Sequence, residues 1–285
     1  MKIPETLLSL AMIGLLSTTP LKAEELQIPL SKPGEPAILF IDSPNATVIV
    51  EAYEGDTIIF DLVEGSSRVG DPTGRRNEWH FDHGWGRQSD VDKSEGMTLI
   101  PSSPGYTIEE QDNTVEFEMD GLMRRFTIKV KVPVNTSLKL ETNNGGDMTI
   151  IGVNGDHELQ NANGAIYAHN ISGSLVAETS NGEVEISFVS IKGDTPMAFS
   201  TVNGDVDVTF PADFAADLRV DPGRGQLFTN FDMKVDAKGA PVKKKTRGGG
   251  TVIEVEKEIR GSINGGGSLL RFETFNGNVY IRKGE

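Results

Sequence analysis

Apolar and polar residues alternate along short segments of this chain, and Asn-Gly or Ser-Gly pairs interrupt the alternation at nearly every tenth residue between Glu141 and Ile186. A period of two is typical of β-strands that bury one face. Asn-Gly between two such runs is a strong signal for a tight turn. The pattern therefore predicts an all-β protein built from short strands.

The turns are of two alternating kinds, and one kind recurs with equivalent neighbours. It has a polar residue three positions before Gly and Asn directly before it, as in "ETNNG", "QNANG", "ETSNG", "STVNG" and "ETFNG". Its glycines, with the second glycine taken in the first copy, are Gly146, Gly164, Gly182, Gly204 and Gly277, and the first three intervals are 18, 18 and 22 residues. Apolar positions repeat on both sides of each glycine, which indicates one coil of strand, corner and strand per repeat.

Repeats of about 20 residues are typical of solenoids, in which each coil buries its inner face against its neighbours. An antiparallel meander would also place alternate turns at one edge. The asparagines favour the solenoid, because in a parallel stack their amides would lie about 4.8 Å apart and form a hydrogen-bonded ladder. The ladder residues are Asn144, Asn163, Asn181, Asn203 and Asn276. We therefore predict an elongated parallel β-solenoid with coils of about 18–22 residues, in which Asn181→Asp costs about 1–3 kcal/mol.

Residues 1–23 have the pattern of a secretory signal peptide, with a basic start, an apolar stretch from Leu7 to Leu16 and a small Ala23 before two glutamates. An uncleaved anchor is the rival interpretation, but a bilayer needs about 20 apolar residues. Residues 24–285 then form a single solenoid domain with polar insertions near 65–96 and 233–250. We expect the protein to be exported to the periplasm or the cell surface.

The chain is acidic, with 42 Asp and Glu against 27 Lys and Arg. Without the predicted signal peptide it keeps 25 basic and 41 acidic residues, a net charge of −16. Such a surface repels phosphate backbones, so nucleic acid is excluded as a partner. The chain contains no cysteine, so it has neither a disulfide framework nor a cysteine that accepts a lipid.

The segment "VPVNTSLKLETNNGGDMTI", followed by repeated T-x-N-G-x-hydrophobic-x-hydrophobic units, resembles the bacterial cell-envelope β-strand-repeat proteins that are often labelled as adhesins. The resemblance extends from Asn45 to Ile281, apart from the two polar insertions. It implies a β-helix-like fold at the cell envelope. It supplies no catalytic residues and no cofactor.

Two groups of polar residues are candidate metal or catalytic sites. His80, Asp82 and His83 in "WHFDHGW" are ligand types for a transition metal, but three donors on a loop are more typical of a solvated segment, and we predict no metal site. Acidic residues recur around the glycines. They are catalytic candidates because β-helix enzymes that cleave polysaccharides use paired carboxylates. Charge on the outside of a solenoid also keeps it soluble, which is the interpretation we favour. These acids are Glu141, Glu178, Glu273, Asp147, Glu183, Asp205 and Asp207.

One basic run stands out in this acidic chain, formed by Lys243, Lys244, Lys245 and Arg247. It is a candidate contact for an anionic partner, such as lipid headgroups or a surface polysaccharide. Alternatively, it lies against the acidic surface of its own chain. His157 occupies an inward apolar position, where we expect its ring to form a hydrogen bond.

The sequence as a whole predicts an exported, non-enzymatic scaffold or adhesin-like protein that presents a long β-surface to envelope proteins or surface glycans. The alternative is a carbohydrate-active β-helix enzyme, which would need a groove lined by converging carboxylates and aromatic side chains. Aromatic residues make up only 7% of the chain, which argues weakly against a sugar cleft. A self-assembling or membrane-proximal sensor component is a third interpretation.

Overall fold

The computed structural model describes residues 25–64, 105–119, 126–144, 146–191, 195–236, 242–247, 250–255 and 258–284. The regular elements in these ranges are all β-strands, so the all-β prediction is confirmed. No helix in this part of the chain is long and apolar enough to cross a membrane. The predicted signal peptide at 1–23 and the predicted insertion near 65–96 lie outside the described residues.

The strands are β1 (Leu26–Pro29), β2 (Ala37–Ser43), β3 (Ala46–Tyr53), β4 (Thr57–Glu64), β5 (Tyr106–Gln111), β6 (Thr114–Met119), β7 (Phe126–Pro133), β8 (Thr136–Thr142), β9 (Met148–Ile151), β10 (Asn154–Asn163), β11 (Ile166–Asn181), β12 (Val184–Ser190), β13 (Met197–Asn203), β14 (Val206–Phe210), β15 (Ala216–Asp221), β16 (Leu227–Thr229), β17 (Met233–Val235), β18 (Val242–Arg247), β19 (Gly250–Val255), β20 (Ile259–Ile263), β21 (Ser268–Asn276) and β22 (Val279–Lys283).

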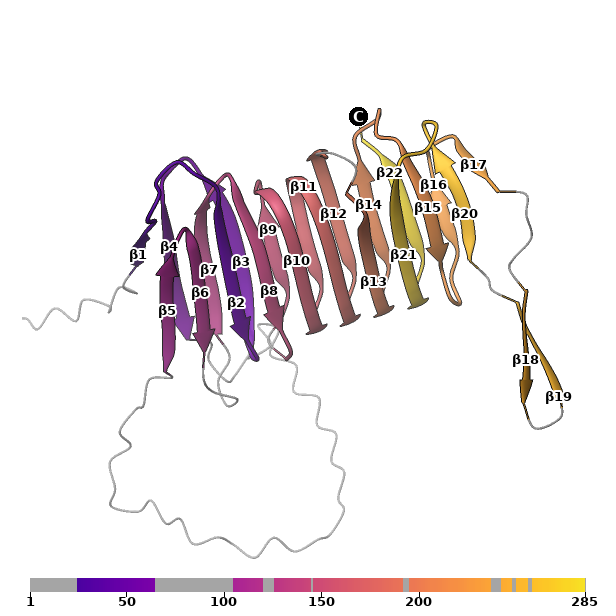
Figure 1. Cartoon of the computed structure of the whole chain (residues 1–285). Coiled ribbons are helices and arrows are strands. Elements are labelled where there is room, and N and C mark those ends of the chain that lie inside the picture. The colour runs from indigo at the N-terminus through magenta and orange to yellow at the C-terminus, as the bar shows by residue number, and fades with distance from the viewer. Residues whose placement is uncertain are drawn as a thin grey trace, which may run out of the picture.

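All strands except β18 and β19 join into one 20-stranded sheet, and those two form a separate two-stranded sheet. Strand β11 pairs with β9 and β12 through its first part and with β10 and β13 through its last part. The large sheet thus folds over on itself and encloses a core between two arrays of strands (Figure 1). The first array runs β5-β6-β2-β8-β10-β11-β13-β21-β15-β20-β17. The second array runs β1-β4-β7-β3-β9-β11-β12-β14-β22-β16.

Pairing is parallel from β6 to β15 in the first array and from β7 to β16 in the second. It is antiparallel at both ends, in the pairs β1–β4, β4–β7, β5–β6, β15–β20 and β17–β20. The prediction of a parallel stack is therefore wrong at the ends, where β5 and β6 are joined by a short turn and the other antiparallel pairs join strands far apart in the sequence. Between β5 and β6, Asp112 and Asn113 have positive φ values of 53° and 63°, as in a tight two-residue hairpin turn.

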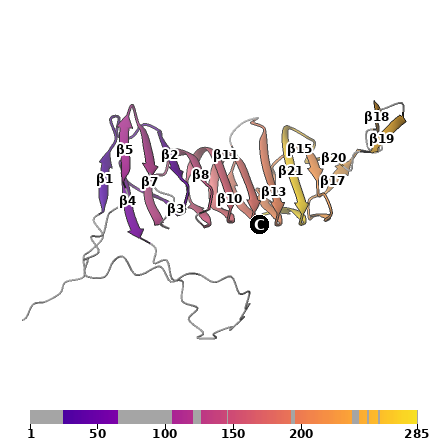
Figure 2. The ribbon, with the colours of Figure 1, turned by 90° about the horizontal axis from the view of Figure 1, so that it is seen from below.

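The order of the coils in space differs from their order in the sequence. We call two strands joined by one corner, such as β13 and β14, a rung. The rung β2/β3 lies between β6/β7 and β8/β9, and the rung β21/β22 lies between β13/β14 and β15/β16. These two out-of-order rungs are visible in Figures 1 and 2, where the colours of neighbouring strands do not follow the order of the sequence.

The core is formed by the inward residues of both arrays, which are almost fully buried. Phenylalanines fill its C-terminal half: the ring of Phe199 lies 5.1 Å from Phe272, 6.2 Å from Phe210 and 6.4 Å from Phe188, measured between ring centres. Full burial of an apolar side chain of this size contributes about 1.5–3 kcal/mol. The alternation read from the sequence thus produces one continuous core.

The corner glycines stack in a close backbone column. A Cβ atom on any of them would overlap the carbonyl oxygen of the glycine in the adjacent rung. These contacts are Gly164 on Gly146, Gly182 on Gly164, Gly204 on Gly182, Gly277 on Gly204 and Gly225 on Gly277. Glycine is required here because no side chain fits between rungs at hydrogen-bonding distance.

A buried polar row lines the inside of the same corner. The Oγ1 hydroxyls of Thr179, Thr201 and Thr274 donate to the carbonyl oxygens of the corner glycine one rung away, at 2.8, 2.8 and 2.9 Å. Asn161 takes the threonine position in an earlier rung and donates from Nδ2 to the carbonyl of Gly146 at 2.9 Å. These bonds satisfy backbone groups that would otherwise be buried without a partner.

Candidate functional site

The asparagines at equivalent corner positions form one hydrogen-bonded row on the outside of the stack. Each Nδ2 donates to the Oδ1 of the next asparagine: Asn163 to Asn144 at 3.0 Å, Asn181 to Asn163 at 2.9 Å, Asn203 to Asn181 at 2.9 Å and Asn276 to Asn203 at 2.8 Å. Arg224 extends the row with a 3.4 Å contact from Nη1 to Asn276 Oδ1. The side chains are exposed. We infer that the row joins rungs and does not bind a ligand.

Replacing Asn181 with aspartate is expected to lower the free energy of unfolding by about 1 kcal/mol. The new carboxylate loses the donor to Asn163 and places negative charge beside an acceptor oxygen. The cost lies at the low end of the sequence-based range because solvent screens this exposed corner. A urea melt measures the change. Replacement of the nearby exposed Ser180 with alanine is the control, and equal stability of Asn181→Asp and wild type would contradict the role of the row.

The structure describes the basic run but not the residues that the sequence indicates as candidate metal ligands. His80, Asp82 and His83 lie outside the described residues, and within those residues no group of three or more histidine or acidic side chains could hold a metal ion. The basic run lies in β18, which pairs only with β19 and is separate from the large sheet. Met233–Val235, at the start of the second predicted insertion, forms β17 in the large sheet.

The acids that precede the corner glycines share one outward row of the first array. Glu141 and Glu178 are separated by Gln160, and Glu178 and Glu273 are separated by Ser200. No two of these three glutamates therefore lie on neighbouring strands. Glu141 lies beside Asp42 on β2, and Glu273 lies beside Asp221 on β15, in both cases as lateral neighbours on one outward face of the sheet.

The acids that follow the corner glycines have partners within the protein. Asp147 and Asp205 accept backbone N–H groups of Ala165 at 2.8 Å and Asn278 at 2.7 Å, so they hold the next corner in place. Glu183 accepts the hydroxyl of Tyr167 at 2.7 Å, as described below. These contacts assign structural roles to carboxylates that the sequence left as catalytic candidates.

The strongest candidate for a binding surface is an outward row on the second array, which we call the aromatic row. Its members occupy the same register position on β11, β12, β14, β22 and β16. They are Tyr167, Glu185, Asp207, Tyr280 and Phe228. At a strand spacing of about 4.8 Å the row is about 19 Å long, with aromatic rings at both ends and two carboxylates between them.

Phe228 and Tyr280 form a stacked aromatic pair, which we call the platform, at one end of this row. Their rings stack with centres 5.1 Å apart and planes inclined by 13°, and Phe228 is 45% exposed. Arg282 lies beside the platform, with its guanidinium 5.2 Å from the centre of the Tyr280 ring. It also donates to both carboxylate oxygens of Asp207 at 2.7–2.9 Å. This bond to Asp207 raises the pKa of Arg282, so the cation is permanent.

Tyr167 forms the other end of the aromatic row. Its hydroxyl donates to Glu183 Oε1 at 2.7 Å, and its ring stacks on His169 with centres 6.3 Å apart. The hydrogen bond to Glu183 is the main reason that the pKa of Tyr167 rises to about 12. The hydroxyl is therefore protonated and fixed in direction at neutral pH.

The aromatic row suits binding better than bond cleavage. Aromatic faces stack on the apolar faces of sugars or of other planar groups, and carboxylates accept hydrogen bonds from hydroxyls. Asp207 is held by Arg282, and Asp207 and Glu185 are lateral neighbours on one outward face of the sheet. Proton transfer by two carboxylates to one bond requires instead that the two groups flank the bond.

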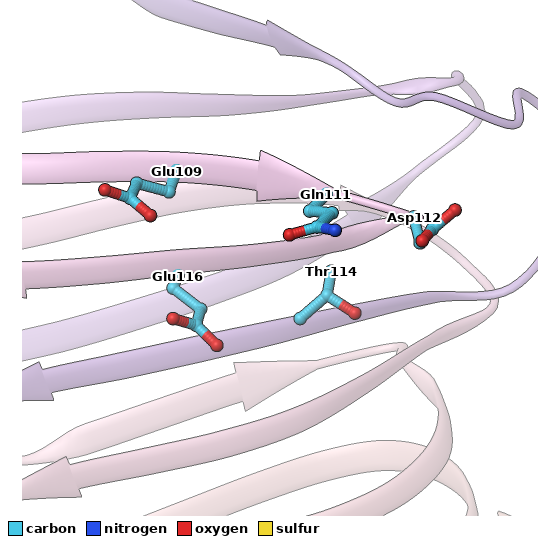
Figure 3. Close-up of a pocket in the computed structure, with 5 residues that line it drawn as sticks. All are labelled: Glu109, Gln111, Asp112, Thr114 and Glu116. Carbon is cyan, nitrogen blue, oxygen red and sulfur yellow. The ribbon is translucent and has the colours of Figure 1, made fainter.

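A small acidic pocket lies at the opposite end of the molecule, on the β5–β6 hairpin. Figure 3 shows its lining residues, and its volume is about 270 Å³. They are Glu109, Gln111, Asp112, Thr114 and Glu116. Glu109 and Glu116 are directly opposed across the two strands, and like charges in that position repel.

The aromatic row and the buried threonine row were not identified from the sequence. The threonines are visible in the repeated "T-x-N-G", but their role as donors to the adjacent corner depends on the stacking. Phe228 and Tyr280 are 52 residues apart and meet because the rung β21/β22 is inserted beside β16. His157 is also a correction: it is buried, and neither ring nitrogen has a hydrogen bond of standard geometry among the described residues. Backbone groups of Ser172 and Val153 nevertheless lie near enough to act against the larger effect of burial on the pKa of His157.

Comparison with known families gives one match, to the Toastrack DUF4097 family, over residues 128–258. This match confirms the resemblance to an adhesin-like β-repeat family. No curated protein matches the chain. A crystal structure of a "putative cell adhesion protein" from Clostridium sporogenes is similar with a TM-score of 0.44 and 12% identity, over 92% of this chain and 99% of the other.

Proposed function

We propose that this chain, whose residues 128–258 match the Toastrack DUF4097 family, is an exported, non-enzymatic β-solenoid scaffold of the bacterial cell envelope. In this proposal it acts as an adhesin-like protein that binds surface glycans. The signal-peptide pattern of residues 1–23 supports export to the periplasm or the cell surface. The parallel pairing between β6 and β15 and between β7 and β16 supports the solenoid.

The aromatic row is the observation that carries the glycan proposal. The stacked rings of Phe228 and Tyr280 offer exposed apolar surface, and Arg282 offers donors beside it. A rigid parallel sheet holds these groups, so little conformational entropy is lost when they bind. The open face suits a chain of sugars better than a small metabolite, which an enclosed cavity would hold.

Replacing Tyr280 with alanine is expected to weaken binding of purified envelope polysaccharide about tenfold, equivalent to about 1.4 kcal/mol. Calorimetric titration measures the affinity. The matched control is Phe275→Ala, because Phe275 is an exposed aromatic residue on β21 outside the row. Equal loss for both variants would contradict binding by the aromatic row, and so would unchanged affinity for Tyr280→Ala.

The carbohydrate-active enzyme is the second interpretation, and the same polysaccharide distinguishes it. A scaffold leaves the polymer length unchanged after prolonged incubation, whereas a glycosidase or lyase shortens it. Chromatography of the polymer detects the difference. Shortening that is lost in Glu185→Gln would replace the scaffold with an enzyme that works on the same face.

A further inference from the structure

Two sheet edges at opposite ends of the molecule lack partners among the described residues. At one end, β5 pairs only with β6. At the other, β18 and β19 pair only with each other, in the segment between β17 and β20 (Figure 1). An isolated two-stranded hairpin is marginally stable in water and gains stability from a third strand. Both edges therefore present backbone groups that are able to pair with another strand.

The two edges are complementary in length and charge. Strands β5 and β18 each contain six residues. Strand β18 carries Lys243, Lys244, Lys245 and Arg247, which is four basic residues in six. The β5–β6 hairpin carries Glu109, Glu110, Glu116 and Glu118, which is four acidic residues. Oppositely charged side chains on neighbouring strands stabilise pairing and fix the choice of partner.

The acidic hairpin carries an electrostatic cost that a basic partner would remove. Glu109 lies directly opposite Glu116, and both side chains are exposed. Neither has a basic partner within the described residues, where Lys32 pairs with Asp112 at 3.3 Å. Glu118 continues the acidic surface towards Asp42 on β2. Cations arriving from a neighbouring strand would offset this repulsion.

The hairpin of one chain cannot reach its own β5. Nine strand-to-strand steps of about 4.8 Å separate β5 from β20, a distance of about 43 Å. Only residues 256–258 join β19 to β20 and extend over about 11 Å, and the six-residue hairpin adds about 20 Å, which together fall short of this distance. A hairpin that meets this edge must therefore come from another molecule.

We propose that the β18–β19 hairpin of one molecule docks on the β5 edge of a second copy, so that the protein assembles head to tail. The contact adds strands to the first array by backbone hydrogen bonds, and the basic and acidic side chains select the pairing. Because the two surfaces differ, a pair of copies keeps one unused edge of each kind. The assembly then grows as an open filament and does not close as a symmetric dimer.

Sedimentation velocity at low and high salt tests the assembly with charge-reversed variants. The hairpin variant is Lys243→Glu with Lys245→Glu, and the edge variant is Glu109→Lys with Glu116→Lys. Wild type is expected to form species larger than dimers at low salt and to dissociate at high salt. Each variant alone is expected to be monomeric, with its association at least tenfold weaker. The matched control is Lys129→Glu with Lys131→Glu on β7, which is expected to assemble like wild type.

Mixing the two variants separates this contact from other kinds of association. The intact hairpin of the edge variant fits the intact β5 edge of the hairpin variant, and the reversed hairpin fits the reversed edge, so the mixture is expected to assemble like wild type. One chain that carries all four reversals is expected to assemble again for the same reason. Monomeric wild type at low salt, a control that dissociates, or a mixture that stays monomeric would each overturn the proposal. So would a hairpin variant that keeps assembling but loses binding to vesicles of anionic lipid.

Discussion

Gly277→Ala is expected to reduce the free energy of unfolding by at least about 4 kcal/mol, a loss typical only of severe disruption in a core. The added Cβ would overlap the carbonyl oxygen of Gly204 in the adjacent rung, and that atom belongs to a fixed backbone. The two rungs must separate at the corner. Separation breaks the bonds from Thr274 to Gly204 and from Asn276 to Asn203. A urea melt followed by circular dichroism measures the loss.

Gly105→Ala is the matched control for this experiment. No atom lies within 4 Å of the position that a Cβ on Gly105 would occupy, so its stability is expected to stay within about 0.5 kcal/mol of wild type. Gly277→Ala with the stability of this control would show that the rungs separate at little cost. The close glycine column would then not be required for the stack.

His157 is expected to make the stability of the protein depend on pH between about 6.5 and 4. Its ring is 4% exposed and lies between Leu138 and Leu175 on the neighbouring strands. Burial among apolar groups disfavours the charged form and lowers the pKa of His157 from 6.5 to about 4. In this pH window the unfolded chain binds a proton that the folded chain does not bind. Stability is therefore complete above pH 6.5 and falls by up to about 3 kcal/mol as the pH drops to 4.

His157→Leu isolates this effect from the titration of the carboxylates. Leucine fits the apolar neighbours and has no proton to bind, so the variant is expected to lose less stability than wild type between pH 7 and pH 4. At pH 7 it is also expected to gain about 1 kcal/mol, because two unpartnered buried nitrogens are removed. Chemical melts at several pH values measure both differences. Parallel curves for the two proteins would show that the His157 ring is solvated.

The corner positions could be predicted from the sequence because the same physical requirement recurs in every rung. Glycine is needed where backbones approach closely, and asparagine and threonine recur beside it where hydrogen bonds pass to the next rung. Each repeat therefore carries its own signal. This holds even for the coils around Asn45 and Gly225, in which one residue of the Asn-Gly pair is replaced. The core follows for the same reason, since alternation within a strand fixes which side chains point inward.

The order of the rungs and the candidate surfaces could not be predicted in this way. Equivalent repeats have similar edges, so a local pattern does not state which rung lies beside which. The antiparallel ends depend on hairpins such as β5–β6, whose strands alternate like those of the parallel region. The platform of Phe228 and Tyr280 required knowledge that β16 and β22 are neighbours. Binding surfaces on a repeat fold depend on which strands are neighbours, and the sequence of a single repeat does not contain that information.

The insertion of the rung β21/β22 between β13/β14 and β15/β16 determines when the chain can finish folding. A ribosome synthesises residues 197–229 before residues 268–283. The rungs β13/β14 and β15/β16 therefore lack the strands that join them until β21 and β22 are available. Simple repeat proteins add units in sequence and fray from their ends. In this protein, by contrast, residues 268–283 follow residues 197–229 in the sequence but lie between them in the stack, so a chain truncated before Ser268 retains two separate open edges. The gap in the C-terminal half thus closes only after β21 and β22 have been synthesised.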